Sequence, residues 1–119
     1  MLRDVENLVF TELTKCLNPL LDSVRFWRTQ SGAEIDFVVE HQGRRLAVAV
    51  KAGATDGKVT RGQRSFIDAY SPEQLLVVGA GTSQGQRIGS TDVIFIEPVD
   101  VARSVLEWRT GRPGASASA

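Results

Sequence analysis

The sequence predicts an α/β fold in which a mixed sheet is flanked by helices. Segments with apolar residues at helical spacing alternate with short segments rich in β-branched residues. The connections between the first three strand-like segments are too short for crossovers, so these strands should form an antiparallel meander. The helix before the fourth strand permits a parallel crossover. The expected order is helix, three strands, helix, two strands and helix.

The first helix is expected over residues 2–17. Apolar side chains recur there at helical spacing, and Asn18 and Pro19 form a stop signal. Glu6 falls inside the apolar arc, where a carboxylate is costly unless it has a partner or faces a cleft. Glu6 is therefore either a border residue that reaches solvent or part of a site.

Three strands should follow, at residues 24–29, 34–40 and 46–51. A two-residue turn at Gln42 and Gly43 joins the last two strands and fixes their register. In this register Asp36 lies opposite Ala49, and the amine of Lys51 can reach Asp36 on the same face. This pair is either an exposed ion pair of little energetic weight or part of a site. Alternation puts Ile35 on the opposite face, with the other apolar residues of its strand.

The second helix is expected over residues 59–70, where Gln63 is a polar member of an apolar stripe. Gln63 is either a boundary residue or part of a site. Further strands are expected at residues 74–79 and 92–97, a last helix from Pro98 to Trp108, and loops at residues 52–61 and 79–90. Residues 1–108 should form one domain and residues 109–119 a flexible tail.

Composition excludes several classes of site and location. One cysteine, Cys16, and one histidine, His41, exclude a disulfide framework and a cysteine- or histidine-rich metal cluster. His41 falls in an expected turn, which disfavours a catalytic pair built on it. The glycine-rich segment at residues 79–85 has Gln84 where a dinucleotide fingerprint needs glycine. The sequence shows no membrane span and no secretory signal, so a cytoplasmic protein is expected.

The zero net charge of the chain conceals a basic segment. The chain has 14 basic and 14 acidic residues, but residues 41–70 contain six basic and two acidic ones. A local excess of cations is compatible with a surface that binds phosphates. The residues expected to contact nucleic acid are Arg44, Arg45, Lys58, Arg61 and Arg64.

Several short motifs, taken in their order along the chain, resemble the PD-(D/E)XK nuclease superfamily. They are Glu6, then Gly32, Glu34 and Asp36, then Val48, Val50 and Lys51, then Gln63. The sequence is more closely similar to the nuclease-like C-terminal domain, of unassigned function, of prokaryotic AAA-type ATPases, which shares an E-N-x-V-x-x-E-L start with residues 6–13. The resemblance covers about residues 2–97 and implies a restriction-endonuclease-like αβββαβ core.

The resemblance also implies roles for individual residues. Asp36 would bind Mg²⁺ or Mn²⁺, with Val50 adding its backbone carbonyl and Glu6 completing the metal shell. Lys51 would position or activate water, and Gln63 would be an accessory catalytic residue. Such chemistry is sound because Mg²⁺ prefers oxygen ligands and its bound water attacks phosphodiesters. One position departs from the pattern, because Ala49 stands where active members carry a second acid.

Three hypotheses for function follow. The first is a nuclease-like domain with a degenerate metal site, acting in nucleic-acid binding or as an accessory module of an ATPase. The second is an active Mg²⁺-dependent DNA endonuclease or junction resolvase that uses Asp36, Lys51 and Glu6. The third is a structural oligomerisation domain without a ligand. The partners expected are accordingly DNA, an AAA-type ATPase and a second copy of the chain in a homodimer.

Overall fold

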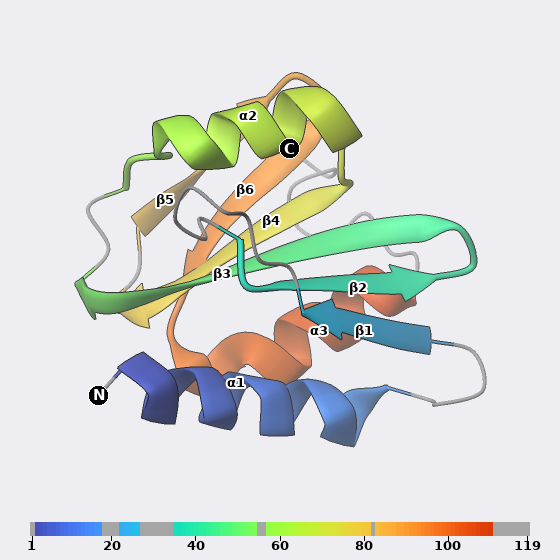
Figure 1. The fold of residues 1–119 in the computed structure, drawn as a ribbon, viewed down its shortest axis with the longest axis vertical. Coiled ribbons are helices and arrows are strands. Elements are labelled where there is room, and N and C mark those ends of the chain that lie inside the picture. Colours follow the sequence, from blue (N-terminus) through green and yellow to red (C-terminus); the bar gives the residue numbers. More distant parts are fainter. Residues whose placement is uncertain (1, 18–21, 27–34, 55–56, 82, 111–119) are drawn as a thin grey trace.

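A computed structural model describes residues 2–17, 22–26, 35–54, 57–81 and 83–110 (Figure 1). One sheet has the strand order β1-β2-β3-β4-β6-β5. The strands are β1 (Asp22–Phe26), β2 (Phe37–His41), β3 (Arg44–Ala54), β4 (Gln74–Ala80), β5 (Ser83–Ile88) and β6 (Thr91–Ile96). The helices are α1 (Leu2–Cys16), α2 (Arg61–Tyr70) and α3 (Val101–Arg109), and a short 3-10 helix, η1 (Pro98–Asp100), leads into α3.

The sheet is mixed, as predicted. Strands β1, β2 and β3 form an antiparallel meander, whereas β4 runs parallel to both β3 and β6. Positive φ angles at Gln42 (52°) and Gly43 (78°) make the predicted two-residue turn, and His41 pairs with Arg44. The α/β fold class and the register of the β2–β3 hairpin are therefore confirmed.

Helices cover both faces of the sheet (Figure 1). Helices α1 and α3 lie on one face, where Leu13 and Val105 join a core with the sheet. Helix α2 covers the other face, where Phe66 and Ile67 pack in a second core with Ala49. Burial of each large apolar side chain contributes about 1.5–3 kcal/mol, so both helical layers stabilise the sheet. No helix of the described residues is long and apolar enough to cross a bilayer.

Two segments predicted to be loops are strands. Strand β3 continues through residues 52–54, and β5 lies inside the glycine-rich segment at residues 79–90. A Cβ atom at Gly85 would lie 3.0 Å from the carbonyl oxygen of Val93 in β6. Glycine there permits a close approach of two strands, a role that composition does not distinguish from loop flexibility.

The sequence predicts the wrong face of the sheet for Ile35. Ile35 packs with Val38 and Ala47 in the core beneath α2, whereas Phe37 and Val39 pack in the core beneath α1 and α3. Strand β2 begins only at Phe37. Strict alternation therefore does not extend back to Ile35.

Candidate functional site

Asp36 lies where the chain enters β2, and its carboxylate is bound to the backbone of β3. Its amide N–H donates to the carbonyl of Val48 at 2.8 Å. Its Oδ2 atom accepts a hydrogen bond from the amide of Val50 at 2.7 Å. The side chain thus satisfies a backbone donor at the point where the pairing of β2 and β3 ends. Asp36 and Val50, which the resemblance pairs as metal ligands, are brought together by this bond.

Strand β3 is irregular just beyond Val50. Val50 pairs with Val78, and Ala54 pairs with Ala80, so the segment after Val50 is longer in β3 than in β4. Lys51, whose side chain is half-buried, lies in this stretch, where the register of β3 against β4 shifts. Bulges bend a strand and redirect side chains, and they are frequent beside functional sites.

The structure does not build a complete metal site from the described residues. Ala49 is 2% exposed and belongs to the core beneath α2. Within the described ranges, no group of three or more His, Cys, Asp or Glu residues is placed to hold a metal ion. Glu34 lies outside the described residues, and for Glu6 only the backbone, in α1, is described. One carboxylate and one carbonyl do not by themselves form a Mg²⁺ site.

Gln63 caps α2. The side-chain carbonyl oxygen of Gln63 accepts a hydrogen bond from the backbone amide of Thr60 at 3.0 Å. The backbone amide of Gln63 in turn donates to Oγ1 of Thr60 at 3.1 Å. This reciprocal pair is a capping box, which satisfies two backbone donors at the start of the helix. A buried, structural role therefore accounts for the polar residue on the apolar stripe of α2.

The five predicted nucleic-acid contacts fall into two groups at opposite ends of β3. Arg44 and Arg45 lie at the hairpin end, where they pair with Glu73 at 2.9 Å and Glu40 at 3.4 Å. The second group lies at the start of α2, near the end of β3 (Figure 1), and comprises Lys58, Arg61 and Arg64. Strand β3 separates Arg44 and Arg45 from Asp36, which is bound to Val50 farther along the same strand.

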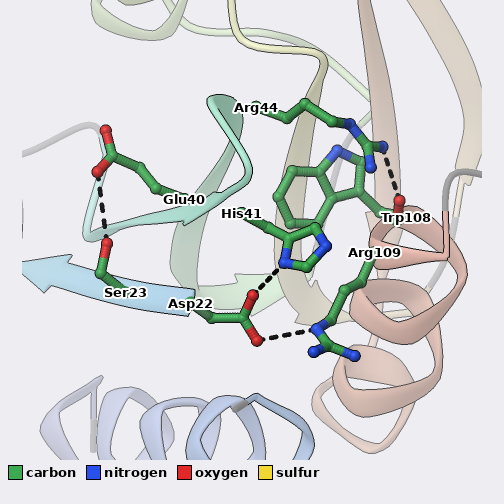
Figure 2. Close-up of polar contacts among 7 residues, drawn as sticks. All are labelled: Asp22, Ser23, Glu40, His41, Arg44, Trp108 and Arg109. Atoms are coloured by element: carbon green, nitrogen blue, oxygen red, sulfur yellow. Dashed lines mark hydrogen bonds and ion pairs between the residues drawn. The ribbon is translucent and has the colours of Figure 1, made fainter. Parts of the chain in front are cut away.

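Asp22, His41 and Arg109 form a largely buried polar cluster that the sequence did not predict (Figure 2). The Nδ1 atom of His41 contacts one oxygen of Asp22, and Nε of Arg109 donates to the other at 2.8 Å. The side chain of Asp22 is fully buried. His41 is the last residue of β2 and not part of the turn, so it continues the core-facing positions of Phe37 and Val39. That alternation was the available signal.

A second group of contacts holds the end of α3 to the sheet. Arg44 donates to the carbonyl of Trp108 at 2.7 Å, and its guanidinium carbon lies 4.9 Å from the centre of the indole ring. The indole N–H of Trp108 donates to Glu73 at 2.9 Å. The hydrogen bond from Arg44, and secondarily that from Trp108, lowers the pKa of Glu73 in spite of the opposing effect of burial. Arg109, placed by the sequence in a tail, is the last residue of α3.

Comparison with known proteins identifies a family and no characterised relative. No curated protein and no solved structure matches the chain. The family model for the domain of unknown function DUF4143 matches residues 4–98. The match runs from α1 through β6 and includes Asp36, Lys51 and Gln63. Domains of this family are known in association with AAA-type ATPases. The chain therefore belongs to the DUF4143 family.

Proposed function

We propose that this domain is a nuclease-like module with a degenerate metal site, and that it serves as an accessory domain of an AAA-type ATPase. The observation that carries the first part is the burial of Ala49. Where the resemblance calls for a second acid, this chain has a methyl group packed 2% exposed beneath α2. The helix, three-strand, helix, strand order and the register shift of β3 just beyond Val50 support a nuclease-like ancestry.

The hydrogen bond of Asp36 gives this residue a structural role that does not depend on metal binding. Its Oδ2 atom accepts from the amide of Val50. An active nuclease would need a second carboxylate beside Asp36, and Glu6 is the residue that this alternative requires. Metal-dependent hydrolysis would then use Mg²⁺ or Mn²⁺ to generate the attacking hydroxide.

A cleavage assay tests the degenerate site. The purified chain is incubated with plasmid, four-way-junction and single-stranded DNA in Mg²⁺ or Mn²⁺, beside samples containing a chelator. We expect no metal-dependent cleavage. The matched variant is Asp36→Asn, because its amide oxygen still accepts from Val50 while the negative charge is lost. Cleavage by the wild type that disappears in Asp36→Asn would establish an active nuclease and overturn the proposal.

A second variant tests ancestry. Ala49→Glu restores the acid that the resemblance calls for, but places it in the core beneath α2. A buried carboxylate is strongly unfavourable unless it is paired or bound to metal. We expect this variant to be destabilised and to regain stability in Mn²⁺ if a nuclease-like metal site underlies the fold. Destabilisation that Mn²⁺ does not relieve would count against that ancestry.

The accessory role is supported by the association of the family with AAA-type ATPases. Its test is the rate of ATP hydrolysis by an AAA-type ATPase from the same organism, measured with and without this chain. A change in rate that saturates with the concentration of the chain is expected. An unchanged rate for every such ATPase of the organism would refute the accessory role and leave the proposal of a degenerate site intact.

A further inference from the structure

We draw no further inference here: the strongest candidate, the set of exposed apolar side chains of Leu8 in α1, Val99 in η1 and Leu106 in α3 on the helical layer that covers one face of the sheet, carries nothing because nothing in the described part of the structure shows what covers these side chains.

Discussion

Replacing Asp22 with asparagine tests the buried cluster that joins β1, β2 and α3 (Figure 2). One oxygen of Asp22 contacts Nδ1 of His41, and the other accepts a hydrogen bond from Nε of Arg109. Asparagine keeps one acceptor for Arg109 but loses the negative charge, and its NH₂ group then faces Nδ1 of His41, which accepts only in the tautomer protonated at Nε2. The side chain of Asp22 is 0% exposed, that of His41 8% and that of Arg109 23%. Removing one partner of a buried ion pair lowers the free energy of unfolding by about 3–5 kcal/mol. Because Arg109 is partly exposed, we expect Asp22→Asn to lower it by about 3 kcal/mol.

Urea unfolding measures the cost. Arg109→Leu should lose about 1–2 kcal/mol, because Asp22 keeps its contact with His41. The double variant should fall short of the sum of the single variants by about 1–2 kcal/mol, since both substitutions remove the same contact. Asp100→Asn is the control, because it breaks an exposed pair with Arg103 whose contribution is at most about 1 kcal/mol. If Asp22→Asn costs no more than Asp100→Asn, the cluster does not hold α3 in place.

Three further predictions concern single side chains. The pKa of Glu73 is lowered from its ordinary value of 4.5, so its contribution to stability is present above that pH and lost as the pH falls through the folded-state pKa. In Glu73→Gln the acid limb of the urea midpoint should be flatter, and an unchanged limb would contradict the role of Arg44. Gln63→Ala should lower the free energy of unfolding by about 1 kcal/mol, whereas Gln63→Glu, which keeps the capping box, should lower it less. Thermal unfolding measures both variants, and equal losses of stability would refute the capping role. Asp36→Ala should lower the free energy of unfolding by about 1–3 kcal/mol, because it leaves the amide of Val50 without its acceptor. If urea unfolding shows a loss no greater than that of Asp36→Asn, this hydrogen bond does not contribute to stability.

The parts of the fold that sequence predicts well depend on local chemistry. Gln42 and Gly43 adopt the positive φ angles of a two-residue turn, and the register set by this turn aligns Asp36 with Ala49 and Val50 of β3. Likewise Ser71 and Pro72 end α2 where the sequence predicts. Gly85 shows the limit of such signals, because the same residue type serves loops and close strand contacts, and only the neighbouring strand decides between them.

The polar cluster at the end of α3 has no comparable local signal. Asp22 and Arg109 are separated by 87 positions in the sequence. Considered separately in the sequence, each residue is typical of a charged surface position. Only the tertiary fold brings the two together beside His41. The same holds for Arg44, whose basic character suggested a phosphate contact but whose donors are bound to Glu73 and to the carbonyl of Trp108. Charge shows that a residue needs a partner, whereas the fold determines whether that partner is internal.

Asp36 combines both difficulties, because one residue type serves two roles at one place. In the nuclease interpretation its negative charge binds metal, and in the structure its Oδ2 atom accepts the amide of Val50 where β2 leaves β3. The first role needs a second acid nearby, and Ala49 does not supply one. The second role needs only an acceptor and is fulfilled without metal. An aspartate in this position is therefore no indication of catalysis by itself. Charge separates the two roles, since asparagine retains the acceptor and loses the metal ligand.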